Sequence, residues 1–157
     1  MTAARSLSNE RTLGRTGASI EAVSLGGEGI LRTRGRTSEA AAMILAALEH
    51  GVRYCDTAPA YDDSQIYYGE AFRRSPGARD RVFMASKTHE RTRDGALALL
   101  EDSLRKLGTD RIDLWQMHDS PDEARFRGDL RSERRDRGRG ARQAGGKGPI
   151  RGPHGTP

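Results

Sequence analysis

The sequence predicts an α/β fold built on parallel strands, either a TIM barrel or an open doubly wound sheet. Short apolar runs alternate with helical stretches from about residue 20 onward, which is typical of parallel strands joined by right-handed crossovers. Three of these runs also end in an ionisable residue, since Asp56, Lys87 and His118 follow one another at intervals of 31 residues. Both folds carry their chemistry at the C-terminal ends of the strands, so we expect the three side chains to meet there.

The beginning of the chain is expected to hold a small hairpin and a glycine-rich turn. Residues 11–20 include two glycines that can supply the positive φ of tight turns, which predicts the hairpin. Residues 22–25 are expected to form a short strand, and Gly26 and Gly27 follow it. Such a turn can let a cofactor approach the backbone, but its spacing is not the dinucleotide fingerprint. The two glycines are therefore either cofactor-binding or plain turn residues.

The alternation continues to residue 117, and each element has its own signal. Thr37 or Ser38 can cap the first helix, and a glycine follows the first and the last helix closely. Cys55, inside a strand, is expected to be a small buried hydrophobe. The expected helices are 37–49, 65–73 and 94–107, and the expected strands are 52–57, 82–87 and 112–117.

Charge is distributed unevenly along the chain. Residues 1–120 hold 17 basic and 17 acidic residues, whereas residues 121–157 hold 10 and 5 and so carry the whole net charge of +5. The second segment has no strand or helix period and too few apolar groups to offset the entropy of ordering. We therefore expect one folded domain at 1–120 and a disordered tail at 121–157. A basic charge can indicate nucleic acid or an anionic membrane as partner, and here that applies only after Ser120.

Composition also bears on location. The single cysteine excludes a disulfide within the chain. No apolar run approaches the roughly 18 residues of a membrane helix. Residues 1–11 lack the apolar core of a signal peptide. The expectation is a soluble cytoplasmic protein with no membrane partner.

The reduction of a carbonyl group is the chemistry that suits the set Asp56, Tyr61, Lys87 and His118. A lysine beside a carboxylate stays charged, and a charged ammonium makes a nearby phenol a stronger acid. Such a phenol can donate a proton to a developing alkoxide, and an imidazole can orient the carbonyl oxygen. The hydride would come from a nicotinamide.

Taken singly, each of these residues has a plainer interpretation. Asp56 can cap the following turn, and the lysine can be a surface charge. Tyr61 can be a loop packing residue, with Tyr67 or Tyr68 as a rival, and the histidine can be an ordinary polar loop residue. The equal spacing favours the set acting together. A metal site is not expected, because the histidines show no ligand spacing and the cysteine stands alone.

Several blocks of this sequence resemble the aldo-keto reductase family. Residues 51–61 look like the first family signature, and residues 85–88 and 110–118 resemble later ones. Residues 13–17 fit the family's N-terminal hairpin. The resemblance covers about residues 11–119, and all four family catalytic positions match.

The resemblance implies an NADP(H)-dependent oxidoreductase on a TIM barrel whose hairpin plugs the bottom. Tyr61 would be the acid, and Lys87 with Asp56 would be the pair that tunes it. His118 would orient the carbonyl of a small-molecule substrate. The positions implied for cofactor binding are Gly26, Gly27 and Asp56.

Two features depart from the family pattern. Gln65 stands where the family usually has Glu, and the tail replaces four βα units that carry most of the family's cofactor contacts. We therefore expect a barrel truncated to about its first four βα units, without activity of its own.

The tail has two interpretations. An out-of-frame extension is favoured, because a shifted frame in a GC-rich gene yields many Arg, Gly, Pro and Ala codons. The alternative is a non-enzymatic binding module whose tail binds RNA through residues 137–140. Phe126 is the tail's one aromatic residue, so nucleic acid is not the expected partner. The oligomeric state is left open.

Overall fold

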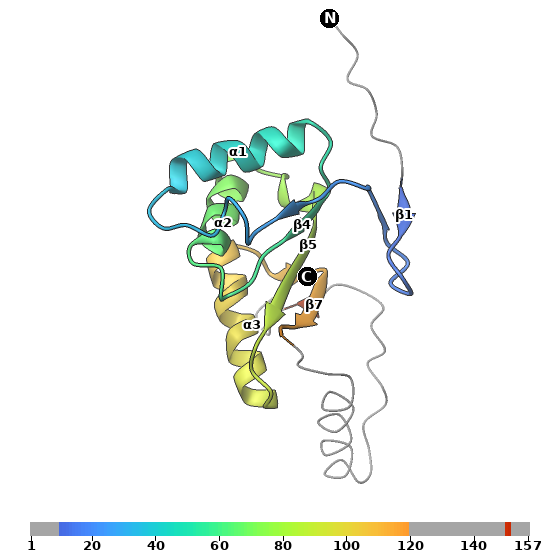
Figure 1. Ribbon diagram of the computed structural model, residues 1–157, viewed down its shortest axis with the longest axis vertical. Helices are drawn as coiled ribbons and strands as arrows, with labels where there is room; N and C mark the ends of the chain where they lie inside the picture. The colour runs from blue at the N-terminus through green and yellow to red at the C-terminus, as the bar shows by residue number, and fades with distance from the viewer. Residues whose placement is uncertain (1–9, 120–149, 152–157) are drawn as a thin grey trace, which may run out of the picture.

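The main sheet consists of four parallel strands in the order in which they occur along the chain. The structure is a computed structural model that describes residues 10–119 and 150–151 (Figure 1). One helix connects each pair of neighbouring strands in this sheet. In chain order the elements are β3 (Leu25–Gly26), α1 (Thr37–Glu49), β4 (Tyr54–Asp56), α2 (Ser64–Arg74), β5 (Phe83–Thr88), α3 (Arg93–Leu107) and β7 (Leu114–Met117).

The three helices cover one face of the sheet. In Figure 1 α2 and α3 lie to the left of the strands and α1 runs above them, and α2 contacts both α1 and α3. A doubly wound sheet reverses its strand order and has helices on both faces. Sequential strand order with a single helix layer is instead typical of a barrel wall. The predicted α/β fold is confirmed. Of the two folds that the sequence left open, the arrangement is that of a TIM barrel and not of a doubly wound sheet.

The predicted N-terminal hairpin is also confirmed. β1 (Arg11–Thr12) pairs antiparallel with β2 (Ser19–Ile20). The turn between them uses positive φ at Gly14 (+52°) and at Gly17 (+77°). In Figure 1 the hairpin lies away from the helix layer, on the other side of the strands. That it plugs a barrel stays a prediction.

Three short elements complete the described structure. η1 (Arg79–Arg81) is a 3-10 turn before β5, and β6 (Arg111–Ile112) precedes β7. β6 pairs antiparallel with β8 (Ile150–Arg151). The disordered tail expected at 121–157 stays a prediction. The rest of 121–157, including the proposed RNA-binding core at 137–140, lies outside the described residues.

The predicted strand 112–117 is divided into β6 and β7 by Asp113. One carboxylate oxygen of Asp113 accepts a hydrogen bond from the backbone N–H of Met84 at 2.7 Å and from the Arg79 guanidinium at 2.8 Å. The side chain thus satisfies a backbone donor that a continuous strand would satisfy with a carbonyl. A period-2 pattern of apolar residues does not reveal this substitution.

The predicted cap of the first helix and the predicted position of the first strand are wrong. Thr37 and Ser38 lie inside α1, and Arg36 occupies the capping position without a side-chain capping bond. The N–H of Arg36 donates instead to the hydroxyl of Tyr67 at 3.1 Å. The strand expected at 22–25 is shifted to β3, so Gly26 belongs to the strand. The other main helices and strands begin and end within two residues of their predicted bounds.

The core lies between the helix layer and one face of the sheet. Because side chains alternate along a strand, Cys55 and Met84 point to the helices and are fully buried, whereas Asp56 lies on the opposite face. The predicted burial of Cys55 is confirmed. The helices contribute the apolar residues Ile44, Leu48, Tyr67, Tyr68, Ala71, Phe72, Leu100, Leu104 and Leu107.

Candidate active site

Asp56, Lys87 and His118 come together because their strands are staggered. The pairing of β4 with β5 sets Asp56 opposite Ala85, and that of β5 with β7 sets Lys87 opposite Gln116. In both pairs the residue opposite lies 29 residues later in the chain. A residue that comes 31 residues later therefore lies two positions further along the next strand. Two residues is one period of side-chain alternation. The three side chains therefore share the face opposite the helices.

Asp56 and Lys87 form an ion pair at the C-terminal ends of β4 and β5. The Lys87 ammonium donates to Asp56 Oδ2, and it also donates to the backbone carbonyl oxygen of Thr57 at 3.1 Å. The Lys87 side chain is 14% exposed and that of Asp56 is 24% exposed. Charges this far removed from water need partners, and here each supplies the other. Lys87 is thus not a free surface charge.

Tyr61 lies in the turn between β4 and α2, and it is 5% exposed. The Lys87 ammonium nitrogen is 4.6 Å from the centroid of its ring, within the range of a cation–π contact. The ring meets the imidazole of His118 edge-on, with centroids 5.5 Å apart. The turn is fixed by backbone bonds from Tyr61 to Ala58 O (3.1 Å) and from Ser64 to Tyr61 O (2.9 Å).

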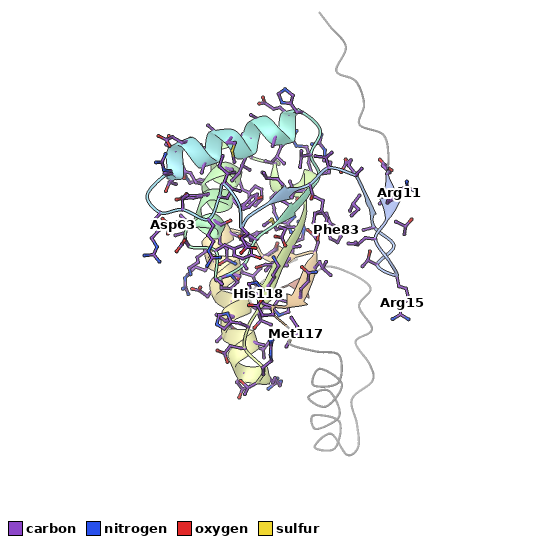
Figure 2. All side chains as sticks on the ribbon, in the orientation of Figure 1. Arg11, Arg15, Asp63, Phe83, Met117 and His118 are labelled. Atoms are coloured by element: carbon purple, nitrogen blue, oxygen red, sulfur yellow. The ribbon has the colours of Figure 1, made fainter. Side chains whose placement is uncertain are left out.

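His118 directly follows β7. Figure 2 shows it near Met117, at the end of the sheet opposite Phe83. Its side chain is 14% exposed, and Nε2 lies 3.8 Å from a carboxylate oxygen of Asp119. Nδ1 is buried and has no hydrogen-bond partner among the residues that the structure describes. Such a nitrogen is costly to leave unpaired, and a bound ligand can satisfy it.

Tyr67 and Tyr68, the rivals of Tyr61, are fully buried in the core. The Tyr67 hydroxyl donates to the carbonyl oxygen of Thr33 at 2.9 Å, and the Tyr68 hydroxyl to that of Leu25 at 3.0 Å. Burial also raises the pKa of Tyr68 well above its usual value. Neither phenol is placed to donate a proton at the strand ends.

The two candidate cofactor-binding glycines differ in their surroundings. A side chain at Gly27 would approach the carbonyl oxygen of Asp56 and the hydroxyl of Ser64 to 2.6 Å each. Gly27 is therefore a site of close packing between β3 and the turn after β4. A side chain at Gly26 would have no neighbour within 4 Å among the described residues, so the backbone there is open to approach.

Sequence reasoning missed the contacts that hold the turn carrying Tyr61. Arg34 forms an ion pair with Asp62 at 2.8 Å. The backbone N–H of Gly35 donates to the carboxylate of Asp63, also at 2.8 Å. The loop before α1 is thus tied to the turn after β4. These partners lie 28 residues apart in irregular segments, where no periodicity could have identified them.

Gln65, the residue that departs from the family pattern, is buried in the core. Its side-chain amide donates to the hydroxyls of Ser86 (3.1 Å) and Ser103 (2.9 Å). These bonds join α2 to β5 and α3. The amide oxygen is buried without a partner in the described part of the chain. Gln65 supports the scaffold and does not reach the cluster.

Thiol and metal chemistry have no candidate site in the described residues. Burial raises the pKa of the Cys55 thiol to about 12, so it stays protonated at neutral pH. Residues 10–119 and 150–151 contain no group of three side chains that could hold a metal ion. No helix among them is long and apolar enough to cross a membrane. The expected absence of a metal and the expected cytoplasmic location stay predictions.

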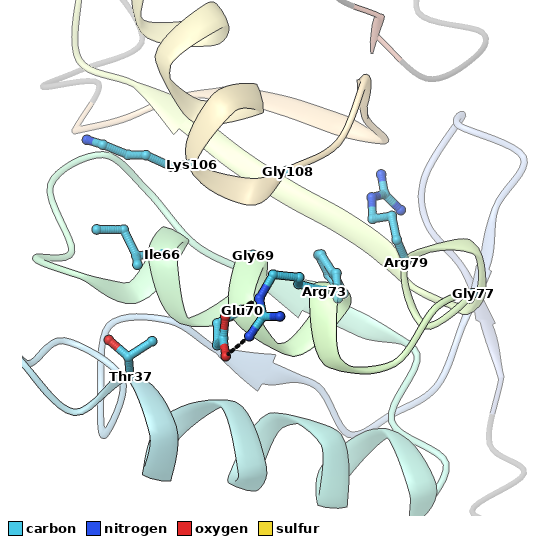
Figure 3. Close-up of a pocket in the computed structure, with 10 residues that line it drawn as sticks. Thr37, Ile66, Gly69, Glu70, Arg73, Gly77, Arg79, Lys106 and Gly108 are labelled. Carbon is cyan, nitrogen blue, oxygen red and sulfur yellow. Dashed lines mark hydrogen bonds and ion pairs between the residues drawn. The ribbon is translucent and has the colours of Figure 1, made fainter.

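A separate pocket of about 480 Å³ opens in the helix layer (Figure 3). Its lining comes from α2, the start of α1, the end of α3, and the segment at Gly77 and Arg79 that leads into η1. Charged groups there are already paired, because Arg73 bonds Glu70 at 2.7 Å and Lys106 lies 2.7 Å from Asp102. None of its lining residues belongs to the cluster at the strand ends, and we assign it no role in the chemistry.

The segment that contains this cluster matches a known protein family. Residues 22–126 match the model described as the aldo/keto reductase family. The chain belongs to the aldo/keto reductase family. The resemblance predicted from the sequence is thereby confirmed, and the matched segment contains all four residues of the cluster.

Curated relatives of this aldo/keto reductase chain carry reductase and dehydrogenase names. The 6-dehydroglucose reductase of Novosphingobium aromaticivorans is 32% identical over 124 residues, which cover 69% of this chain and 40% of that protein. The glycerol 2-dehydrogenase (NADP(+)) of Saccharomyces cerevisiae is 32% identical over 104 residues, which cover 66% of this chain and 31% of that protein. The chain thus spans about 40% or less of the length of these two relatives.

Solved structures of the family share the fold. An aldo/keto reductase from Brucella melitensis superposes with a TM-score of 0.59 at 27% identity, covering 78% of this chain and 47% of that one. An aldo/keto reductase from Klebsiella pneumoniae, solved in complex with NADP and acetate, gives a TM-score of 0.55 at 28% identity, covering 63% and 35%. The described residues therefore form the first part of a TIM barrel.

Proposed function

We propose that this chain forms the proton-donating part of an NADP(H)-dependent site that reduces aldehydes or ketones to alcohols. One arrangement carries the proposal. The Lys87 ammonium, held by Asp56, lies beside the ring of Tyr61, and the edge of that ring meets His118. Membership of the aldo/keto reductase family supports the same reaction.

Tyr61 is the proposed acid. Its hydroxyl would donate a proton to the alkoxide oxygen that forms as the carbonyl group is reduced. The Lys87 ammonium would stabilise the phenolate left behind, because opposite charges attract strongly in a poorly hydrated site. The carboxylate of Asp56 holds that ammonium in place by accepting its hydrogen bond.

His118 is the proposed orienting group. Its ring is mostly buried and lies against Tyr61, so an oxygen hydrogen-bonded to the phenol would be near the imidazole. A second donor to the carbonyl oxygen fixes its direction and stabilises the negative charge that develops there. Both contacts act on the oxygen and leave the carbonyl carbon free.

NADP(H) is the proposed cofactor, and a bound NADPH would supply the hydride. The residues present fit this assignment, because a phenol, an ammonium and an imidazole suit an oxygen that becomes negative. Gly26 with its open surroundings and the partly exposed Asp56 are proposed to face the cofactor. Gly27 is proposed to contribute only its backbone, since packing fills the space where a side chain would lie. The names of the yeast relative and the Klebsiella structure support NADP.

The proposed substrate is a small carbonyl compound. The methylglyoxal reductase DkgA of Salmonella typhimurium, 36% identical over 80 residues, is named for such a substrate. The alternative of an RNA-binding module rests on residues 121–149 and 152–157, which lie outside the described structure. The cluster at the strand ends supports the reductase.

We also propose that the 157-residue chain alone has no measurable reductase activity. Hydride transfer requires reacting atoms about 3–3.5 Å apart, and a displacement of about 1 Å can cost on the order of a hundredfold in rate. A chain that spans about 40% of the Novosphingobium relative supplies only part of the contacts that hold the cofactor there.

A fusion chain tests the proposal. It joins residues 1–119 to the remaining part of the Novosphingobium reductase, and the measurement is loss of NADPH absorbance with an aromatic aldehyde. We expect turnover by the fusion chain and none by the 157-residue chain. Tyr61→Phe, which keeps the ring and removes the proton, should lower kcat/KM by about 10²-fold or more. Turnover that is indifferent to Tyr61→Phe would refute the proposed role.

A further inference from the structure

The ring of His118 has no hydrogen-bonded anchor of its own in the described structure. Nδ1 is buried without a partner, and Nε2 is 3.8 Å from Asp119, beyond hydrogen-bond distance. The ring packs edge-on against Tyr61, and such packing does not fix its direction as a hydrogen bond would. The position of the imidazole therefore depends on how firmly the backbone of His118 is held.

That backbone is held from two directions. The N–H of His118 donates to the carbonyl oxygen of Thr88 at 2.8 Å, which extends the pairing of β5 with β7 by one bond. On the other side, one guanidinium nitrogen of Arg91 donates to the carbonyl oxygen of His118 at 2.6 Å and to that of Asp119 at 3.1 Å. These bonds leave little freedom to the peptide units on either side of the histidine.

The conformation of Asp119 explains how one nitrogen reaches both carbonyls. Asp119 has φ of +50°, a left-handed conformation that is unfavourable for a residue other than glycine. Successive carbonyls of an extended strand point in opposite directions. The left-handed turn ends that alternation directly after His118, and Arg91 compensates for it with two hydrogen bonds.

We propose that Arg91 is a positioning residue that fixes His118 against Tyr61. Arg91 lies three residues after β5, the strand that carries Lys87, so its bonds join the ends of the two strands that bear the lysine and the histidine. This inference rests on the proposed function of His118. It adds a residue that acts on His118 through the backbone.

The two hydrogen bonds from Arg91 to the carbonyls of His118 and Asp119, called the clamp below, are tested in the 157-residue chain without any assay of activity. Amide hydrogen exchange and the ¹⁵N and ¹H signals of the four histidine rings are compared between the unaltered chain and Arg91→Ala, with His118→Gln assigning the signals. Arg93→Ala is the matched control, because Arg93 is an exposed neighbour that bonds only Asp94 among the contacts described. Arg91→Lys keeps the charge but cannot present the same planar donor group.

We expect the His118 amide in Arg91→Ala to exchange at least about tenfold faster, because the strand end opens more often. The ring signals of His118 should shift while those of His50 and His89 stay in place. The exchange rate in Arg91→Lys should lie between those of Arg91→Ala and the unaltered chain, and the rate in Arg93→Ala should match that of the unaltered chain. Unchanged exchange and unchanged His118 signals in Arg91→Ala would overturn the proposal.

Activity then separates the two hypotheses. In the fusion chain, Arg91→Ala should lower kcat more than it raises KM, because a misplaced imidazole weakens the transition state more than it weakens binding. Hydrogen exchange can show the clamp while the activity of the fusion chain is indifferent to Tyr61→Phe. That result would refute the proposed function and leave Arg91 as a structural contact. A Tyr61-dependent fusion chain with unaltered kcat in Arg91→Ala would refute the positioning role.

Discussion

Two adjacent glycines at the end of β3 have different reasons to lack a side chain. At Gly27 the neighbouring atoms are the carbonyl oxygen of Asp56 and the hydroxyl of Ser64, and Ser64 also accepts a hydrogen bond from Thr57 at 2.9 Å. Packing there sets the distance between β3 and the turn that leads to Tyr61. At Gly26 the space is open.

This contrast predicts opposite results for two alanine substitutions. Gly27→Ala should lower the free energy of unfolding by about 1–3 kcal/mol, because the backbone must move to admit the methyl group. Gly26→Ala should change it by less than about 0.5 kcal/mol. Urea unfolding followed by circular dichroism measures both. Equal losses in the two variants would contradict the packing assigned to Gly27.

The sequence predicted the cluster because its residues follow a repeat of the fold. The two βα units between β4 and β7 each add a register offset of 29 residues, and the spacing of 31 adds one period of side-chain alternation. The residue pattern alone did not separate Tyr61 from Tyr67 and Tyr68, since the hydroxyls of the latter two are bonded to carbonyls in distant segments. The family resemblance was needed to select Tyr61. Sequence reasoning could not find Arg91 either, because an exposed arginine in a loop shows no pattern.

At the level of elements, α2 combines a buried face with a charged outer face. Glu70 accepts hydrogen bonds from Arg73 and Arg74 at 2.7 Å, one helical turn away. These guanidinium groups lower the pKa of Glu70 from 4.5 to about 2, and the hydrogen bond from Arg73 has the largest effect. The helix thus carries a charge network on the side facing the pocket in Figure 3.

The lowered pKa of Glu70 predicts how stability depends on pH. Because the pKa in the folded chain is below the unfolded value, the contribution of Glu70 is complete above about pH 4.5 and is lost as the pH falls toward about 2. Glu70→Gln should therefore be less stable than the unaltered chain at pH 7, and the difference should shrink over this range.

Urea unfolding at several pH values checks this dependence. Glu39→Gln is the control, because Glu39 is an exposed residue of α1 with a single arginine partner at 3.2 Å. It should change little at any pH, as expected for a surface pair. A difference between Glu70→Gln and the unaltered chain that is the same at pH 7 and pH 3 would show that the network is not formed.

The sequence predicted element identity better than element ends. Helix spacing and the alternation of apolar runs placed all three main helices within one residue of their bounds. The predicted cap of the first helix was wrong because the start of that helix has a tertiary partner, the Tyr67 hydroxyl, which bonds the N–H of Arg36. The division of the last strand depends on the side chain of Asp113 in the same way.

At the scale of the whole molecule, the described residues form part of a barrel wall with its own core. Cys55 reports on that core, because it is the only cysteine and lies fully buried between the sheet and the helices. Burial and a thiol pKa of about 12 both suppress its reaction with thiol reagents.

Thiol labelling therefore measures opening of the core. We expect Cys55 in the native chain to react at least about a hundredfold more slowly than in the urea-unfolded chain, since core sites open only by sub-global or global unfolding. The rate should rise across the same urea range in which circular dichroism is lost. Labelling within a fewfold of the unfolded rate in the absence of urea would contradict a packed core.

The central claim is that the residues at the strand ends act as one site for proton donation. A double-mutant cycle in the fusion chain tests it most directly, with kcat/KM for an aromatic aldehyde measured in Tyr61→Phe, Lys87→Met and the double variant. Residues that act as a unit lose most of their effect with the first substitution. We predict that the double variant is less active than Tyr61→Phe alone by no more than a fewfold. Losses that multiply, so that the double variant falls by the product of the two single effects, would contradict the claim that Lys87 acts through Tyr61.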